Sequence, residues 1–300
     1  MNRRKFIQNF SLGSGSVLLS FSSFGQLISK EKSSKITILH TNDTHSNIDP
    51  FPINHAKYPG MGGVSRRHAL IQQIRKEEEH VLLLDSGDIF QGTPYFNMFG
   101  GELEMKLMTE MGYDAATMGN HDFDIGLEGF KKAKQHAKFP FLCANYDFSD
   151  TILKGEIKSY EIFQKDDLRI GVFGIGIDLN GLVAENNYQK TKFLNPISRA
   201  ERIAKVLKQK GCDLVICLSH LGYEYADETK ISDRKLAQQT SHIDLILGGH
   251  THSFLEKPTI EKNKKGQNVL INQVGYAGLY LGRIDIDMKK GVFCRRLEIK

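Results

Sequence analysis

The stretch LILGGHTHSF, residues 245–254, joins a short apolar run to two glycines and two histidines. Such an apolar run is typical of a buried strand. Side chains alternate between the two faces of a strand, so we expect His250 and His252 to point to the same side. A second apolar run, ITILHTNDTHS, ends in the same way with Asp43 and His45. Two such endings indicate a functional site built where strands end.

Length and composition place the chain among ordinary globular proteins. It has 300 residues, of which 40% are hydrophobic and 25% charged, which suits one large domain or two small ones. The net charge is +5, and Arg3, Arg4 and Lys5 account for three of these units, so the rest of the chain carries +2. No basic patch interleaved with aromatic residues stands out, and we expect no nucleic-acid partner.

Residues 1–33 resemble a twin-arginine export signal followed by a short linker. Paired arginines precede a weakly apolar stretch broken by serine and glycine, too short for a membrane span of about 20 residues. We therefore expect an exported, periplasmic bacterial protein that contacts a membrane only if the signal stays uncleaved. The alternatives are an uncleaved anchor or a disordered tail.

From about residue 35 the sequence alternates between strand and helix patterns, and after Pro258 it changes to hairpins. The pattern predicts an α/β fold with mixed sheets completed by antiparallel strands. One predicted helix, residues 196–211, has apolar residues along one face and a glycine at its end. The four cysteines have no zinc-type spacing, and we interpret them as buried free thiols.

Several predicted strands end in polar residues of the kind that bind metals. These are Asp43, His45, Asp88, Asn120, His121, Asp122, Asp124, His220, His250 and His252. Sites in open α/β sheets form beyond the carboxyl ends of the strands. A single Asp or His at such a place is usually a turn residue or a structural hydrogen-bonding group, but five segments with the same feature are hard to explain as capping.

This set of side chains exceeds the needs of one metal ion. Nitrogen and oxygen ligands without thiolate suit Zn, Mn, Fe or Co. The set matches two divalent ions that share a bridging carboxylate. Two such ions, about 3.5–4 Å apart, hold a phosphoryl group and generate a hydroxide nucleophile at neutral pH.

The motifs together carry a family resemblance. The stretches LHTNDTHS, DSGDIFQGTP, MGNHDFD, LSHLG and GGHTHS resemble those of the calcineurin-like metallophosphoesterases. The flanking sequence is similar to the 5'-nucleotidase branch, which includes UDP-sugar hydrolases, from about residue 35 to 290. The resemblance implies a four-layer α/β/β/α sandwich in residues 34–300 that hydrolyses phosphoesters, nucleotide-like or small, in nucleotide catabolism.

The resemblance also implies a role for each site residue. A first metal ion would be bound by Asp43, His45, Asp88 and His252. A second ion would be bound by Asp88, Asn120, His220 and His250. The catalytic pair would be His121, which faces the phosphate beside Asn120, and Asp124, which orients the His121 ring. We interpret His40 as structural.

Members of this branch carry a C-terminal substrate domain, and this sequence stops at Lys300. We therefore expect the substrate domain to be absent and a separate protein to supply it. The alternatives are a stand-alone phosphatase with weak selectivity, a metal-loaded scaffold subunit, and sulfur-ester hydrolysis as in a thiosulfate-oxidising relative.

Overall fold

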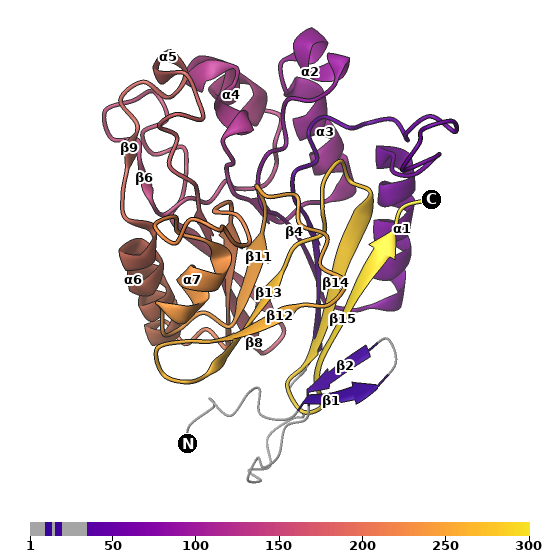
Figure 1. Ribbon diagram of the computed structural model, residues 1–300, viewed down its shortest axis with the longest axis vertical. Helices are drawn as coiled ribbons and strands as arrows, with labels where there is room; N and C mark the ends of the chain where they lie inside the picture. The colour runs from indigo at the N-terminus through magenta and orange to yellow at the C-terminus, as the bar shows by residue number, and fades with distance from the viewer. Residues whose placement is uncertain (1–9, 14–15, 20–34) are drawn as a thin grey trace.

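The structure is a computed structural model that describes residues 10–13, 16–19 and 35–300 (Figure 1). Most of the predicted export signal, residues 1–33, lies outside the described residues. The two described pieces of it, β1 (Phe10–Gly13) and β2 (Ser16–Leu19), pair as antiparallel strands. No helix in the described ranges combines the length and apolar character needed to cross a bilayer.

A five-stranded sheet contains the first strands of the main fold. Its order is β15 (Gly291–Glu298), β14 (Tyr280–Asp287), β3 (Lys35–Thr41), β4 (Val81–Asp85) and β5 (Ala115–Ala116). Strands β3, β4 and β5 are parallel, whereas β14 pairs antiparallel with β3, and β15 pairs antiparallel with β14. The predicted completion of a parallel sheet by antiparallel strands is therefore confirmed.

A six-stranded sheet forms the other half. Its order is β12 (Thr259–Lys262), β13 (Asn268–Asn272), β11 (Leu245–Gly248), β10 (Leu214–Ser219), β8 (Leu168–Ile175) and β7 (Tyr160–Lys165). The four inner strands are parallel and the two edge strands antiparallel. Two short strands, β6 (Tyr146–Asp147) and β9 (Lys192–Phe193), pair separately.

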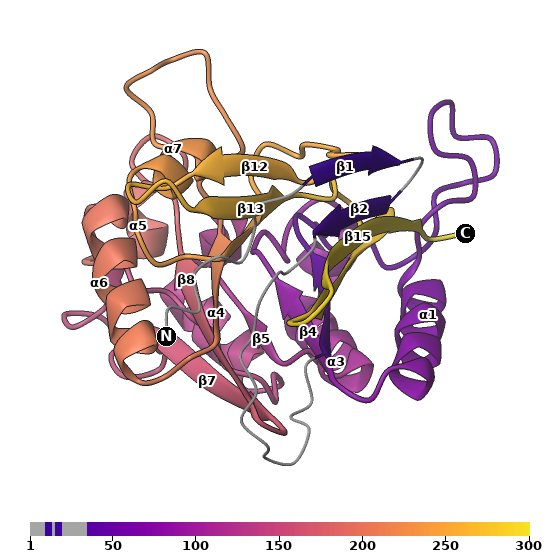
Figure 2. The ribbon, with the colours of Figure 1, turned by 90° about the horizontal axis from the view of Figure 1, so that it is seen from below.

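The two sheets pack face to face, and helices cover their outer faces (Figure 2). The five-stranded sheet is covered by α1 (Val64–Glu77), α3 (Glu102–Met111) and α4 (Gly126–Lys134). The six-stranded sheet is covered by α6 (Pro196–Gln209) and α7 (Asp233–Gln238). Leu82 and Ile284 of one sheet meet Val172 and Ile216 of the other in the core between them. The predicted α/β/β/α sandwich is confirmed.

Local sequence signals explain the ends of α6. The Asn195 side chain accepts a hydrogen bond from the Ser198 N–H at 2.9 Å, and Pro196 occupies the first turn. Beyond the C-terminus, Gly211 has a φ of 81°, a conformation that glycine adopts without strain. Ala200 and Leu207 are buried, as the periodicity predicts.

The strand predicted at FPFLCANY was wrong in its extent. Leu142 N–H bonds to Ala116 in one sheet, whereas Ala144 N–H bonds to Gly174 in the other. Because the segment crosses from one sheet to the next, it follows no single partner: Phe141 and Leu142 form isolated bridges, and only its last residue, Tyr146, belongs to a strand, β6. The four cysteines are free and buried, as predicted.

Candidate metal centre

The carboxyl ends of β3, β4, β10 and β11 lie at the same edge of the sandwich, at the top of the view in Figure 1. The loops that follow these strands touch across the two sheets. The His220 ring, after β10, lies 2.7 Å from the Ser86 carbonyl oxygen, after β4. The His250 N–H, after β11, donates to the Asp43 carboxylate, after β3, at 2.9 Å. The fold therefore brings distant segments into one site.

Three side chains, which we name the first cluster, gather at the outer part of this edge: Asp43, His45 and His252. The Nε2 atoms of the two histidines are 3.0 Å apart. His252 Nε2 lies 3.4 Å from Asp43 Oδ1, and His45 Nε2 lies 3.9 Å from the same atom. All three side chains thus direct a potential ligand atom at one point.

Three further side chains, the second cluster, lie deeper: Asp88, His220 and His250. His220 Nε2 is 3.0 Å from Asp88 Oδ2, and His250 Nδ1 is 2.9 Å from Asn120 Oδ1. Asp88 Oδ2 also lies 3.9 Å from His45 Nε2 of the first cluster. The Asp88 carboxylate therefore sits between the two clusters, and the Asn120 amide oxygen joins the second.

The backbone at these residues is strained. Asp43, His45, Asp88, His250 and His252 all have φ between 48° and 73°, in the left-handed region that non-glycine residues rarely adopt. Such strain concentrates at functional sites, where the surrounding fold enforces it.

This backbone corrects the alternation argument made from the sequence. Strand β11 ends at Gly248, so His250 and His252 lie on a turn and not on an extended strand. Their rings separate, one to each cluster. The pattern H-x-H located the site, but turn geometry decides where each ring points.

The tautomers of two histidines suit metal binding. Their Nδ1 atoms face carbonyl oxygens, His220 toward Ser86 at 2.7 Å and His45 toward Phe90 at 3.2 Å. An imidazole that donates from Nδ1 presents a lone pair at Nε2. His220 Nε2 is buried and has no hydrogen-bond partner among the described residues, although Asp88 Oδ2 is 3.0 Å away. An unprotonated Nε2 at this distance would repel the carboxylate, so either a proton or a metal ion must lie between them, and the nitrogen and oxygen donors here fit a metal ion.

The buried carboxylates of the site also favour a positive charge beside them. Burial alone opposes protonation of His220, but the nearby Asp88 carboxylate outweighs it and raises the pKa of His220 to about 10. Burial raises the pKa of Asp88, but the neighbouring His220 lowers it by more, so that the pKa of Asp88 lies below its usual value. Burial and the His220 charge lower the pKa of His250 to about 4. Without a metal ion the site draws a proton to His220, which indicates a strongly negative potential.

His121 and Asp124 form the pair expected from the sequence. His121 Nδ1 lies 2.7 Å from Asp124 Oδ2. The hydrogen bond to Asp124 raises the pKa of His121. The His121 N–H donates to Asp88 Oδ1 at 2.8 Å, and the ring lies edge-on to His45 at 5.3 Å between centroids. The ring is half-exposed beside the clusters and belongs to neither.

Asn42 and Asp122 support the site through hydrogen bonds. The Asn42 amide donates to Asp43 at 2.6 Å and accepts from Val274 N–H at 3.0 Å. The buried Asp122 carboxylate accepts from the N–H groups of Asp88 and Gly119. Burial raises the pKa of Asp122 to about 7. Asp122 is therefore a local hydrogen-bonding group, as expected of an Asp after a strand, whereas nothing in the sequence singled out Asn42.

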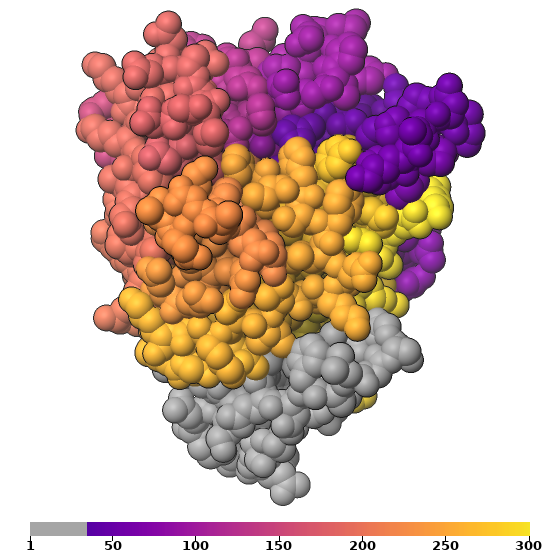
Figure 3. Space-filling model, viewed as in Figure 1, coloured from indigo at the N-terminus to yellow at the C-terminus, as the bar shows by residue number. Residues whose placement is uncertain are grey.

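Aromatic side chains border the first cluster. The Tyr276 ring stacks on His252 with centroids 5.0 Å apart and planes 15° apart. Tyr58 and Phe254 contact Tyr276 edge-on. Tyr58 belongs to the segment between the first cluster and α1, which projects from one side of the molecule (Figure 3). No sequence spacing predicted that Tyr276 would meet His252.

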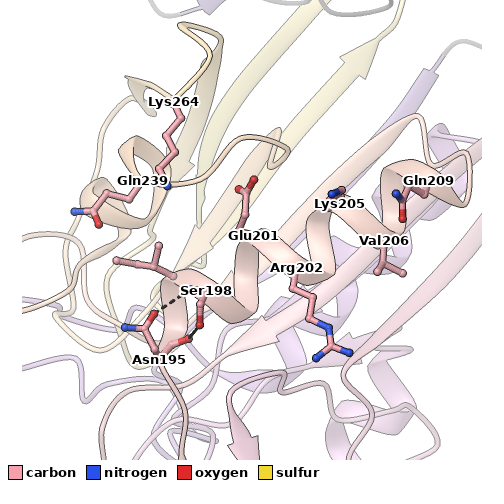
Figure 4. Close-up of a pocket in the computed structure, with 10 residues that line it drawn as sticks. Asn195, Ser198, Glu201, Arg202, Lys205, Val206, Gln209, Gln239 and Lys264 are labelled. Atoms are coloured by element: carbon pink, nitrogen blue, oxygen red, sulfur yellow. Dashed lines mark hydrogen bonds between the residues drawn. The ribbon is translucent and has the colours of Figure 1, made fainter.

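Other surface features do not compete with this site. The groove in Figure 4 runs along the outer face of α6 and is lined mainly by polar side chains such as Arg202 and Lys205, without histidine or cysteine. A third group, Glu79, His80 and Asp166, is largely exposed. Its His80–Asp166 ion pair at 2.9 Å accounts for that arrangement.

Comparison with known proteins agrees with this geometry. The family model described as calcineurin-like phosphoesterase matches residues 36–254. A snake venom 5'-nucleotidase from Gloydius brevicauda is 32% identical over 272 residues, covering 84% of this chain and 45% of the relative.

Solved structures give the same result. A 5'-nucleotidase precursor from Thermus thermophilus has a TM-score of 0.80 and 30% identity, over 88% of this chain and 54% of that one. The NAD nucleotidase of Haemophilus influenzae has a TM-score of 0.74 and 28% identity, over 89% and 50% of the two chains.

The chain thus spans about half the length of the relatives it matches. The match to the family model covers most of the sandwich and every strand whose end carries one of the two clusters. From the motifs, the fold and this match, the chain belongs to the calcineurin-like phosphoesterase family.

Proposed function

We propose that this protein is a metal-dependent phosphoester hydrolase that acts on 5'-nucleotides or related small phosphoesters. The observation that carries the proposal is the pair of clusters joined at Asp88, with the His121–Asp124 pair beside them. The relatives named as nucleotidases support the substrate class.

Each side chain near the clusters has a distinct role in this proposal. One divalent ion would be held by the first cluster, Asp43, His45 and His252. The other would be held by His220, His250 and Asn120. The Asp88 carboxylate would contact both ions. When bound, two such ions supply Lewis acidity and a water of lowered pKa. Ion identity is Zn, Mn, Fe or Co by ligand type.

His121 acts on the substrate and not on the ions. Asp124 fixes its ring through Nδ1, so Nε2 is the nitrogen available to the phosphate or to the leaving oxygen. Asn120, whose amide oxygen faces His250, lies next to His121 and would contact the phosphate from the same side.

The test combines metal analysis with hydrolysis. Purified protein should contain two transition-metal ions per chain and should hydrolyse p-nitrophenyl phosphate with added Mn. Fewer than one ion per chain after reconstitution would exclude the metal-dependent mechanism. Binding of two ions without hydrolysis of any phosphoester would instead favour the scaffold role.

Recognition of the rest of a nucleotide is a separate proposal. We propose that the surface that binds the base does not belong to residues 35–300. It would be contributed by a further domain, either of a longer chain or of a separate protein. The support is that the relatives are about twice as long as the stretch matched here. With this chain alone, a micromolar KM for AMP would contradict the proposal.

We also propose that residues 1–33 direct export to the periplasm and that residues 34–300 form the catalytic domain. The paired arginines at positions 3 and 4 support export. Replacing both with lysine should retain the protein in the cytoplasmic fraction of a bacterial host, and unchanged periplasmic yield would exclude the twin-arginine route.

A further inference from the structure

A small internal cavity of about 20 Å³ lies behind the loop that carries His45. Its lining includes Ser46, Arg67 and Glu104, which are 2%, 3% and 5% exposed. The rest of the wall is largely apolar, with side chains of α1 and α3 such as Val64 and Met108. Two opposite charges are therefore enclosed with one hydroxyl in an apolar setting.

The polar atoms at this cavity are without partners. Arg67 Nε and Nη1, both Glu104 carboxylate oxygens and Ser46 Oγ have no hydrogen bond to any described residue. Burial of a charged group without hydrogen bonds costs several kcal/mol. The Arg67 guanidinium also acts on the buried Asp85 carboxylate, where it opposes the rise in pKa that burial causes, so Glu104 is not the only carboxylate near Arg67.

The cavity has the size and the chemistry for water. A water molecule needs about 10–15 Å³ of such space and two to four polar partners. We propose that an ordered internal water links Arg67, Glu104 and Ser46, and that this linked ion pair positions the loop of the first cluster. The water accepts from the guanidinium and donates to the carboxylate and to the Ser46 hydroxyl oxygen.

The backbone contacts of Ser46 show why its side chain matters for His45. Both residues have strained φ values, 48° for His45 and 52° for Ser46. The Ser46 N–H donates to Ile89 at 2.9 Å, and its carbonyl accepts from Thr93 at 2.6 Å. The hydroxyl is the remaining group that can anchor this turn, and Ser46 lines the same cavity as Arg67 and Glu104.

Arg67 also supports the other side of the first cluster. Its guanidinium packs against Gly278, where a Cβ atom would overlap with Nη1. The neighbouring Ala277 N–H donates to the Asp43 carbonyl oxygen at 2.7 Å, and Tyr276 stacks on His252. Arg67 therefore contacts the segment that supports Asp43 and His252, which makes it a positioning residue.

The expected effect on metal binding rests on the proposed function. Calorimetric titration of the metal-free protein with Mn²⁺ tests this effect. Glu104→Gln and Arg67→Gln should weaken one of two binding events about 10–100-fold, as loss of a supporting group does, and leave the other unchanged. The matched controls are Glu102→Gln, on the same helix in a surface ion pair with Lys106, and Arg66→Gln, the exposed neighbour of Arg67. Unchanged affinities in the Arg67 and Glu104 variants would overturn the positioning role.

Thermal unfolding tests the ion pair without metal. Each single variant removes one of the two charges that the water links and should lower Tm by about 10 °C, whereas the double variant should lose less than the two single losses added together. If the losses of Tm in the single variants add up in the double variant, or equal those of the control variants, the proposed link between Arg67 and Glu104 is wrong. If the single variants do not fold, the Ser46→Ala variant and a crystal structure of the unmodified protein test the proposal instead. A cavity without water in that crystal structure would overturn the proposed internal water. A protein that binds no metal but shows this water and non-additivity would contradict the proposed function alone.

Discussion

The first and second clusters use the same kinds of side chain in different surroundings. In the first cluster the His252 side chain is 40% exposed and that of His45 10% exposed. In the second, His220 is fully buried, Asp88 is 2% exposed and His250 is partly exposed. Asp43 of the first cluster is fully buried, so the contrast lies between His220 and the two histidines of the first cluster. Desolvation strengthens electrostatic attraction, so the second cluster should bind its ion more tightly and exchange it more slowly.

Topology explains the difference in burial. His220 follows β10, an inner strand of the six-stranded sheet, and its ring reaches Ser86 beyond the other sheet. His252 lies four residues past the end of β11, at the rim, where Tyr276 covers one face of its ring. His220, directly after its strand, is therefore enclosed, whereas His252, further along its loop, remains near water.

The largest effect should come from the residue that the clusters share. Asp88→Asn removes the charge that approaches histidines of both clusters. Activity should fall by more than about 10³-fold, as for a group on which a whole site depends, and elemental analysis should show loss of both ions. Retention of one tightly bound ion would indicate that the clusters are independent.

Substitution of His121 tests whether the reaction needs a catalytic side chain in addition to the metal ions. His121→Asn should lower kcat by about 10²–10⁴-fold with both ions retained, because the ring is in neither cluster. Asp124→Asn should lower kcat less, since it orients the ring through one hydrogen bond. If metal content falls in the His121 variant, the ring is a ligand and its assignment here is wrong.

Graded chelation tests the difference between the clusters directly. As chelator concentration rises, one ion should leave first, and the concentrations that release the two should differ by about tenfold or more, as 1.4 kcal/mol of affinity would give. His252→Ala should lack the early-released ion and keep the other. Simultaneous release of both ions from the unmodified protein would contradict the distinction drawn from burial.

The smallest effect concerns a buried histidine that has no carboxylate beside it. His40 is fully buried, and its partner is the Asn272 amide at 2.8 Å. Burial lowers the pKa of His40 from 6.5 to about 3. Between these values the unfolded chain binds a proton that the folded chain does not, so stability falls as the pH falls below 6.5.

This shift should make the protein about 2 kcal/mol less stable at pH 5 than at pH 7. His40→Gln removes the titrating group, and denaturant unfolding at the two pH values should show a smaller difference. The control is His68→Gln on α1, where the side chain is partly exposed. An undiminished pH dependence in the His40 variant would assign the effect to other groups.

Part of the site could be predicted because its residues stand at strand ends in short motifs. Asp43, His45, Asp88 and His220 each follow an apolar run within a few residues, and the sequence order of strands and helices implies a parallel arrangement. Asn42, Tyr276 and the Arg67–Glu104 pair could not be predicted. Apart from the contact of Asn42 with Asp43, their partners lie far away in the chain, and no periodicity encodes such contacts.

The sequence by itself determined the α/β class, the helix α6 with its cap and terminating glycine, and the residue types available at the strand ends. These properties depend on local periodicity and on the backbone preferences of single residues. The tertiary structure alone decided which histidine joins which cluster, which cluster is buried, and what supports each loop. Those outcomes depend on left-handed turns at His250 and His252 and on the packing of two sheets, where contacts between distant segments override the alternation expected of a strand.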